Sequence, residues 1–230
     1  NGKSSVADFY YQILKLNKKK VASIGTLGVK SNNFNLNLQN TTIDPIQLSQ
    51  ILNKLKKKRV DNVIMEASSH GLKQNRLDGL KFNSGIFTNF SQDHLDYHKN
   101  LKNYLKAKLY LYENLMKNKG QVITDENIPQ FKKIKKITIN KNLKLNILND
   151  KKNNFEFLSH NYQGESQIIN IKLNKSVKKI KVNLIGKIQI KNILMAIIAA
   201  KKSNLDLKKI LSVIPKLSSV EGRFEKIGKI

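Results

Sequence analysis

The chain opens with residue types that bind phosphate. Residues 1–5 read Asn-Gly-Lys-Ser-Ser, which matches the second half of a phosphate-binding loop. In such a loop the backbone amides and the lysine hold phosphate oxygens, and the serine hydroxyl holds a magnesium ion. Val6, Phe9 and Ile13 follow at helical spacing, as expected of the helix that such a loop enters. The upstream glycine of the full pattern is not in the chain, so the motif alone is weak, and we expect the chain to begin inside it.

Glu66 is the first candidate metal ligand. It directly follows Val63-Ile64-Met65, an apolar run that predicts a buried strand. A carboxylate at a strand end near phosphates suits Mg²⁺, which prefers hard oxygen ligands and shares them with nucleotides. The alternative is a glutamate that caps the next helical turn. The phosphate-binding loop favours the metal.

The segment 91–98 places two acids and two histidines within one short stretch. It follows Asn89, which lies at the end of another predicted strand, and such density after a strand is typical of a site. We expect His94 to contact a metal and His98 to be structural or exposed. The alternative is a capping segment, in which a serine or aspartate begins a helix and the histidines are solvated.

Lys108 lies on the apolar stripe of a helix that we predict over residues 97–116. Leu101, Leu105, Tyr112 and Leu115 belong to the same stripe. A lone buried ammonium is costly, so a lysine there must be paired, neutralised or chemically modified. The alternative is that its stem is buried while its amine reaches water. The sequence leaves both open.

The pattern of elements predicts a scaffold that brings these residues together. Short apolar runs alternate with helical stretches, which predicts βαβ units around a parallel sheet. The expected strands cover residues 21–24, 63–65, 85–87, 121–123 and 136–139, and the expected helices residues 45–57 and 97–116. Ligands collect beyond the carboxyl ends of strands in such sheets, so Gly25-Thr26, the Glu66 cluster and Thr88-Asn89 should meet the phosphate-binding loop on one rim.

The second half of the chain has a different pattern of predicted elements. Residues 155–157, 167–173 and 180–184 predict three antiparallel strands, and helices are expected over residues 188–203 and 207–214. The Lys/Asn-rich tract 140–154 has low complexity and is expected to be a solvated loop. The expected fold class is α/β, with a P-loop-type, mostly parallel sheet flanked by helices and a small antiparallel sheet in the second half.

Composition narrows the function classes. The 230 residues contain no cysteine, which excludes disulfides, zinc–thiolate sites and thiol catalysis from this segment. No apolar stretch is long enough to span a membrane. The net charge of +27 comes from lysines spread along the whole chain with many Asn and Ile residues, as an AT-rich genome would produce. The alternative is a polyanion-binding surface, but we expect neither nucleic acid nor membrane as a partner.

Several blocks together resemble the Mur ligases, and among them the UDP-N-acetylmuramoyl-tripeptide synthetases (MurE type). The blocks are Asn-Gly-Lys-Ser-Ser at 1–5, Ile-Gly-Thr-Leu-Gly at 24–28, Asn-Thr-Thr at 40–42, Met-Glu-Ala-Ser-Ser-His-Gly-Leu at 65–72, Phe-Thr-Asn-Phe-Ser-Gln-Asp-His-Leu-Asp-Tyr-His at 87–98, Tyr-Leu-Lys-Ala-Lys at 104–108 and Glu-Gly-Arg-Phe-Glu at 221–225. The blocks at 65–72 and 87–98 separate this type from its sister ligases and from folylpolyglutamate synthase.

The resemblance implies an ATP-dependent ligase of peptidoglycan synthesis, monomeric and cytoplasmic. In this family the γ-phosphate of ATP passes to the D-glutamate carboxylate of UDP-MurNAc-L-Ala-D-Glu, and the amine of a diamino acid attacks the acyl phosphate. The implied partners are UDP-MurNAc-L-Ala-D-Glu and the diamino acid, with meso-diaminopimelate expected and L-lysine as the alternative. The implied cofactors are ATP, Mg²⁺ and a CO₂-derived carbamate on Lys108.

The resemblance also implies roles for single residues. The implied ATP-binding residues are Asn1, Gly2, Lys3, Ser4, Ser5, Asn192 and Arg223. The implied magnesium ligands are Ser4, Glu66, His94 and carbamylated Lys108, and the implied catalytic residues are Lys3, Glu66, His94 and Lys108. The implied contacts to the UDP-MurNAc-dipeptide are Asn40, Thr41, Thr42, Ser68, Gln74 and Arg76. Two positions depart from the family pattern: Gln189, usually Asn, near the adenine, and Gln92, where Arg is common.

Under this resemblance, residues 1–225 form the central ATP-binding domain and residues 226–230 begin a C-terminal domain that selects the amino acid. An N-terminal domain for the uridine end would precede them. We therefore expect residues 1–230 alone to have no ligase activity.

Three rival functions fit parts of the sequence. A polyanion-binding module would use the charge and bind nucleic acid with steep salt dependence, but it does not explain Glu66, His94 or Lys108. A sister ligase of the folylpolyglutamate or cyanophycin type would lack the 40–42 loop with Gln74 and Arg76. A catalytically dead paralogue is disfavoured by the intact candidate residues.

Overall fold

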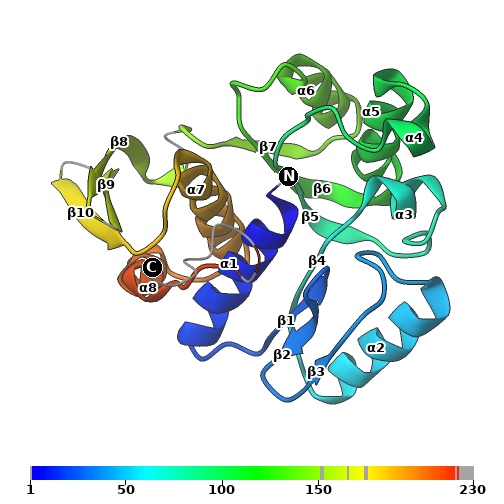
Figure 1. Ribbon diagram of the computed structural model, residues 1–230, viewed down its shortest axis with the longest axis horizontal. Coiled ribbons are helices and arrows are strands. Elements are labelled where there is room, and N and C mark those ends of the chain that lie inside the picture. Colours follow the sequence, from blue (N-terminus) through cyan, green and yellow to red (C-terminus); the bar gives the residue numbers. More distant parts are fainter. Residues whose placement is uncertain (1, 151–152, 165, 174–175, 221, 223–230) are drawn as a thin grey trace, which may run out of the picture.

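The structure of the chain is a computed structural model that describes residues 2–150, 153–164, 166–173, 176–220 and 222 (Figure 1). Its strands form three sheets, of which two contain parallel pairings and the third is antiparallel. Figure 1 shows helices packed around these sheets. The predicted α/β fold class, with a small antiparallel sheet in the second half, is confirmed. Asn1, Arg223 and the expected boundary after residue 225 lie outside the described residues.

The first sheet has the strand order β3-β2-β1-β4. β4 (Asn62–Met65) pairs in parallel with β1 (Val21–Gly25), so the predicted strands at 21–24 and 63–65 are confirmed as neighbours. On the other side of β1 lie β2 (Gly28–Ser31) and β3 (Asn35–Leu36), which are antiparallel and were not predicted. Gly28 makes the tight β1–β2 turn possible, because its φ of +80° is readily available only to glycine.

The second sheet is entirely parallel, with the order β5-β6-β7. β5 (Phe82–Phe87) and β6 (Met116–Thr124) confirm the strands predicted at 85–87 and 121–123. β7 (Lys144–Ile147) falls in the tract 140–154, so the prediction of a solvated loop is wrong for these residues. Asn146 of β7 is buried. Its side-chain amide donates to Gln121 Oε1 at 3.1 Å, and this hydrogen bond offsets the cost of burying a polar group within the sheet.

The third sheet confirms the antiparallel strands predicted in the second half. Its order is β10-β9-β8, with β8 (Glu156–Gln163), β9 (Ser166–Leu173) and β10 (Ser176–Val182). Ile169 and Ile171 on the central strand are 0% exposed and belong to the larger hydrophobic core. In Figure 1 this sheet lies on one side of α1 and α7, and the two sheets with parallel pairings lie on the other.

Two long helices occupy the centre of the molecule. α1 (Lys3–Leu16) and α7 (Lys187–Lys202) pack side by side, and Phe9, Ile13, Ile193 and Ile197 are all 0% exposed in their shared core. The remaining helical segments are α2 (Pro45–Lys57), α3 (Ser69–Lys73), α4 (Leu95–His98), α5 (Leu101–Tyr110), η1 (Leu111–Leu115), α6 (Phe131–Asn140), α8 (Leu207–Val213) and η3 (Ile214–Lys216). Among the described residues, no helix has the length and apolar character needed to cross a membrane.

The strand predicted at 136–139 is wrong, because these residues lie in α6. The run of β-branched residues there is short and favours a strand locally. The helical period becomes visible only from Phe131 onwards: Ile134 is 0% and Ile137 8% exposed, whereas Ile139 is 70% exposed. Packing of one helical face against the second core therefore outweighs local β-propensity.

The continuous helix predicted over 97–116 is also wrong. α4 ends at His98, and Lys99 has a φ of +68°, which an α-helix does not accommodate. Asn100 then begins α5 as its N-cap, with its side chain accepting from the backbone N–H of Asn103. The chain continues as the π-helical turn η1, and Met116 already belongs to β6.

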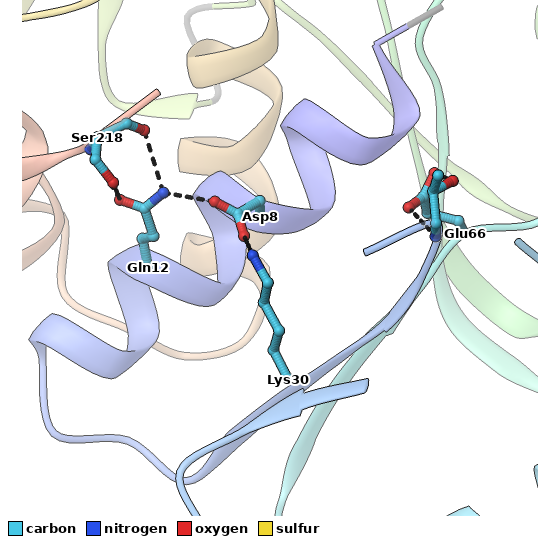
Figure 2. Close-up of polar contacts among 6 residues, drawn as sticks. Asp8, Gln12, Lys30, Glu66 and Ser218 are labelled. Atoms are coloured by element: carbon cyan, nitrogen blue, oxygen red, sulfur yellow. Dashed lines mark hydrogen bonds and ion pairs between the residues drawn. The ribbon is translucent and has the colours of Figure 1, made fainter. Parts of the chain in front are cut away.

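A buried carboxylate on α1 connects distant parts of the chain (Figure 2). Asp8 is 5% exposed, and its Oδ1 lies 3.0 Å from Lys30 Nζ on β2. Its second oxygen accepts from Gln12 Nε2 at 2.6 Å, and Gln12 Oε1 accepts from the backbone N–H of Ser218 at 3.0 Å. The polar face of α1 thus links the first sheet to the segment that follows α8.

We predict that Ile193→Ala lowers the free energy of unfolding by about 2–5 kcal/mol, because it leaves a cavity between α1 and α7. Ile139→Ala, at a position that is 70% exposed, is the matched control and should change it by less than about 0.5 kcal/mol. Urea unfolding followed by circular dichroism measures both. Equal losses would mean that the α1–α7 contact is not the centre of the core.

Candidate active site

A cavity of about 800 Å³ lies where the start of α1 meets the ends of β1 and β4. It brings together predicted site residues from five separate segments of the sequence. The predicted residues that line it are Gly2, Lys3, Ser4, Ser5, Asn40, Thr41, Thr42, Glu66, Ser68, Gln74, Arg76, His94 and Asn192. Lys108 is the one described member of the predicted set outside this lining; with Lys3 it lines a neighbouring cavity of about 420 Å³.

Glu66 connects the start of α1 with the ends of β1 and β4. Its side chain is buried, and its Oε2 accepts a hydrogen bond from Ser4 Oγ at 2.8 Å. Its Oε1 accepts from the backbone N–H of Thr26 at 2.8 Å, so the turn after β1 is held to the same carboxylate. Gly25 must lack a side chain here, because a Cβ would lie 2.2 Å from Glu66 Oε1. The start of α1, the end of β1 and the end of β4 therefore meet at one group.

The Ser4–Glu66 pair fits a magnesium ion. Both groups supply hard oxygens, and they already lie within hydrogen-bond distance of each other. Within the described residues, no ion pair gives the buried Glu66 carboxylate a cationic partner. The same part of the chain holds no group of three His, Asp or Glu side chains arranged for a metal. An ion at this position would take its other ligands from phosphate and water, as Mg²⁺ does at nucleotide sites.

Thr42 shapes the wall of the cavity beyond Glu66. Its Oγ1 donates to the backbone carbonyl of Glu66 at 3.0 Å and accepts from the backbone N–H of Ser68 at 2.9 Å. Arg76 Nη1 donates to the backbone carbonyl of Thr42 at 2.6 Å, which uses one of the five N–H donors of the guanidinium group. Thr41 lies alongside, with its Oγ1 3.0 Å from Thr26 Oγ1. The 40–42 loop is thus fixed to the strand-end cluster.

His94 lies at the mouth of the cavity. It adopts a left-handed backbone conformation with a φ of +54°, and its Nε2 is 3.4 Å from Asp93 Oδ2. The ring of His70 lies 4.8 Å from that of His94. Burial and the neighbouring His94 lower the pKa of His70. The His70 ring therefore favours the neutral form, in which a ring nitrogen is able to bind a metal or accept a proton.

His98 is structural, which is one of the two alternatives predicted for it. It is 4% exposed, and its Nε2 lies 3.0 Å from Ser69 Oγ at the start of α3. Burial, followed by the proximity of His70 and His94, lowers its pKa. Nearby, Gln74 Nε2 donates to the Tyr97 hydroxyl at 3.1 Å, which links the Glu66 side of the cavity to α4.

Lys108 is half-buried on α5, and its amine does not simply extend into water. Nζ donates to the backbone carbonyl of Asn89 at 2.9 Å and lies 5.1 Å from the centre of the Phe87 ring. Burial, together with the positive charge of Lys3, lowers the pKa of Lys108 to about 8. The neutral amine, which is the nucleophilic form, therefore makes up about a tenth of the population at pH 7 and about half at pH 8.

Gly2 and Asn192 close the cavity on the α7 side. Gly2 has a φ of +85°, and a Cβ at this position would lie 2.8 Å from Asn192 Oδ1. Asn192 Nδ2 donates to Gln189 Oε1 at 3.1 Å. Gln189, where the resemblance leads us to expect Asn, is therefore hydrogen-bonded to Asn192. Both side chains are buried.

Sequence reasoning missed some residues that line the cavity. Thr26, His70, Asp93 and Gln189 line it but were not among the predicted site residues, although Thr26 was expected on the rim and Gln189 near the adenine. Their positions next to predicted motifs were the available signal. The contribution of Thr26 rests largely on its backbone N–H, which residue type does not reveal.

Comparisons with known proteins found relatives that match along the whole chain. The UDP-N-acetylmuramoyl-L-alanyl-D-glutamate–2,6-diaminopimelate ligase of Rickettsia bellii is 36% identical over 233 residues, covering 100% of this chain and 49% of that protein. A solved structure of a ligase with the same name has a TM-score of 0.86 at 26% identity, covering 100% of this chain and 47% of the other. The MurF ligase of Thermotoga maritima in complex with ADP has a TM-score of 0.66 at 16% identity, covering 100% and 49%.

The chain spans about half the length of the curated relatives that it matches. A family model gives the most direct evidence of its family. Residues 1–200 match the family described as Mur ligase middle domain. The chain therefore belongs to the Mur ligase family.

Proposed function

We propose that this chain is the ATP-binding part of a ligase that adds meso-diaminopimelate to UDP-MurNAc-L-Ala-D-Glu in the cytoplasm. The observation that carries the proposal is the single cavity that contains the phosphate-loop residues, Glu66 and the 40–42 loop. The relatives named as diaminopimelate ligases align with 99–100% of this chain. L-lysine as the added amino acid is the second candidate.

The phosphates of ATP are proposed to lie over Gly2, Lys3, Ser4 and Ser5. These residues open α1, where free backbone N–H groups and the helix dipole attract anions. Lys3 adds a positive charge directly at the cavity. The ADP-bound MurF structure shares this fold, which supports a nucleotide at the same place. Asn192 is proposed to lie near the adenine, together with Asn1 and Arg223 outside the described residues.

Magnesium is proposed to bind at Ser4 and Glu66, with His94 as a further contact. The ion would offset the negative charge that develops during phosphoryl transfer. Glu66 supplies a buried carboxylate whose hydrogen bonds to Ser4 and Thr26 fix its orientation before any ligand arrives. This preorganisation keeps the carboxylate from swinging away when the cavity fills.

Lys108 is proposed to carry a carbamate that acts as a further oxygen ligand. The ammonium first loses one proton to water. The neutral Nζ then bonds to the carbon of CO₂, one C=O π bond opens to a C–O⁻, and a second proton leaves to water, so a cation becomes an anion. A pKa of about 8 makes the reactive amine available. The product would also relieve the repulsion between Lys108 and Lys3, which is one of the causes of the low pKa.

The muramoyl-dipeptide is proposed to lie along Asn40, Thr41, Thr42, Ser68, Gln74 and Arg76. Arg76 suits a carboxylate or phosphate because its planar fork donates in pairs. Its bond to the Thr42 carbonyl holds the guanidinium at the cavity wall. The D-glutamate carboxylate would then face the γ-phosphate across the same 800 Å³ space.

The test uses the longer protein that contains this chain. Phosphate release is followed with UDP-MurNAc-L-Ala-D-Glu, ATP and Mg²⁺, with either meso-diaminopimelate or L-lysine as the amine. We expect release only with meso-diaminopimelate. Release only with L-lysine would transfer the assignment to the second candidate. No release with either amine would contradict a tripeptide ligase and direct the search to glutamate and folate substrates.

We predict that Lys108→Ala lowers the rate of this reaction by about 100-fold or more, because a metal-binding charge is lost. Lys106→Ala is the control, since Lys106 is exposed on the same helix, and it should have less than about a twofold effect. Formate, a small carboxylate, should restore part of the activity of Lys108→Ala only. An unaffected Lys108→Ala enzyme would exclude the carbamate.

We predict that the carbamate forms at a mildly alkaline pH. With a pKa of about 8, roughly half of the Lys108 amine is neutral at pH 8, against about 0.4% for an ordinary lysine. A carbamate signal from ¹³C-bicarbonate should therefore appear in NMR spectra of the wild type near pH 8. Its persistence in Lys108→Ala would assign the signal to another amine.

We predict that Gly2→Ala weakens ATP binding by about 10-fold or more, because its Cβ would collide with Asn192. Gly79→Ala is a matched control: Gly79 has a similar φ of +84°, but nothing lies within 4 Å of its Cβ position. Both variants carry the same backbone strain, so only Gly2→Ala should affect calorimetric titrations with ATP. Equal weakening would mean that backbone strain, rather than the shape of the loop, governs binding.

A further inference from the structure

Asp125 is a buried carboxylate that has no role in the proposed function. It directly follows β6, and its side chain is 3% exposed. Its Oδ2 accepts a hydrogen bond from Lys191 Nζ on α7 at 2.5 Å, and the two groups form an ion pair. Its Oδ1 accepts from the backbone N–H of Asn127 at 2.9 Å and from Asn127 Nδ2 at 3.1 Å. The carboxylate thus joins the turn after β6 to the first part of α7.

The Asp125–Lys191 pair is charged, and its breakage is costly. Burial favours the neutral form of Asp125, but the hydrogen bonds from Lys191 and Asn127 and the charge of Lys191 outweigh burial and lower the pKa of Asp125. The carboxylate is therefore ionised at neutral pH. Removal of the lysine would leave a buried anion without its cation, which is strongly unfavourable.

Among the described residues, no side chain caps the start of α7. Gly186 occupies the N-cap position with a φ of +96°, where a serine, threonine or aspartate side chain would normally fix the first turn. Within the same part of the chain, the contact between Lys191 and Asp125 is the one ion pair that α7 makes. The position of the first two turns of α7 therefore depends on this pair more than on a cap.

Two neighbours of Lys191 on α7 line the cavity of about 800 Å³. They are Gln189 and Asn192, whereas Asp125 and Lys191 lie outside the lining. Asn192 Nδ2 donates to Gln189 Oε1 at 3.1 Å, and Asn192 Oδ1 lies 2.8 Å from the position of a Cβ on Gly2. A small rotation of the start of α7 would therefore move both amide side chains relative to Gly2.

We propose that Asp125 and Lys191 are positioning residues whose ion pair holds the start of α7, so that the amides of Gln189 and Asn192 meet the base of the bound nucleotide. The proposal rests on the proposed function, because it requires ATP in this cavity. Neither member of the pair touches ATP. Lys191 acts through its own helix, on which residues 189 and 192 share a face, and Asp125 supplies a fixed point at the end of β6.

The test measures ATP-dependent phosphate release by the longer protein that contains this chain, with saturating UDP-MurNAc-L-Ala-D-Glu and diamino acid. We expect Lys191→Met to raise the KM for ATP about 10-fold and to change kcat by less than about twofold, because misplaced amides weaken ground-state and transition-state binding alike. A substitution that only reduces the amount of folded enzyme would lower kcat and leave KM unchanged. Calorimetric titration with ATP should show the same loss of affinity.

Lys187→Met is the matched control. Lys187 is exposed at the first position of the same helix, so its replacement removes the same charge without breaking the ion pair. It should change KM and kcat by less than about twofold. Lys191→Arg should return the KM to within about threefold of the wild type, because a guanidinium group also donates to a carboxylate.

Asp125→Asn breaks the pair from the other side. Asp125→Asn alone and the double variant with Lys191→Met should each raise the KM for ATP about 10-fold, because all three variants remove one interaction. The double variant contains no unpaired buried charge, so it decides the question if Lys191→Met does not fold. An increase of about 100-fold in the double variant would mean that the two residues act independently and would overturn the proposal.

The wild type separates this proposal from the proposed function. If the wild type neither binds ATP nor releases phosphate, the proposed function fails, and the positioning role fails with it. If the wild type is active and Lys191→Met has the same KM as Lys187→Met, only the positioning role is wrong. A lower kcat at an unchanged KM in Lys191→Met would likewise overturn the positioning role alone.

Discussion

The hydrogen bonds of the buried Glu66 carboxylate are the constraint on which the site depends. Ser4 and Thr26 donate to its two oxygens, so the start of α1 and the turn after β1 converge on the end of β4. A buried carboxylate is expensive unless its lone pairs are satisfied. Here the groups that satisfy it are also groups that line the cavity. Stability and ligand geometry are therefore set by the same bonds.

Positive charge is the second feature that shapes the cavity. Lys3 lines both cavities, and its positive charge contributes to the low pKa of Lys108. This repulsion is unfavourable in the free protein and is relieved by bound phosphate near Lys3 or by modification of Lys108. The net charge of +27 acts in the same direction at long range, because it attracts anionic substrates in general. The proposed specific recognition is local and relies on groups such as Arg76, which is fixed against the 40–42 loop by its bond to the Thr42 carbonyl.

The sequence predicted which residues gather around one cavity better than it predicted the scaffold around them. Strand ends could be found because an apolar run followed by polar residues marks them, as at Met65-Glu66. The hairpin strand β3 is only two residues long, Asn35 and Leu36, so it leaves no period to detect. α6 was misassigned because Ile and Thr favour strands locally, and only burial of Ile134 fixes the helix.

Other misses have a different cause, since they depend on single backbone angles and bonds. The break at Lys99 follows from one positive φ and the cap by Asn100. The role of Thr26 rests on its N–H, and the bond of Lys108 Nζ to the Asn89 carbonyl needs tertiary geometry. Periodicity indicated that Lys108 faces inward, but it gave no partner. Residue types therefore indicate which residues gather at the cavity, whereas the hydrogen-bond partners of Thr26 and Lys108 depend on the folded structure.

The most direct measurement of the central claim is the effect of Mg²⁺ on ATP affinity in the wild type and in Glu66→Gln. The glutamine keeps an acceptor for Ser4 and nearly the same shape, but it removes the charge that would hold the ion. Calorimetry should show that Mg²⁺ tightens ATP binding by about 10-fold or more in the wild type and by less than about twofold in the variant. An equal Mg²⁺ effect in both proteins would contradict the account, because the ion would then bind without Glu66.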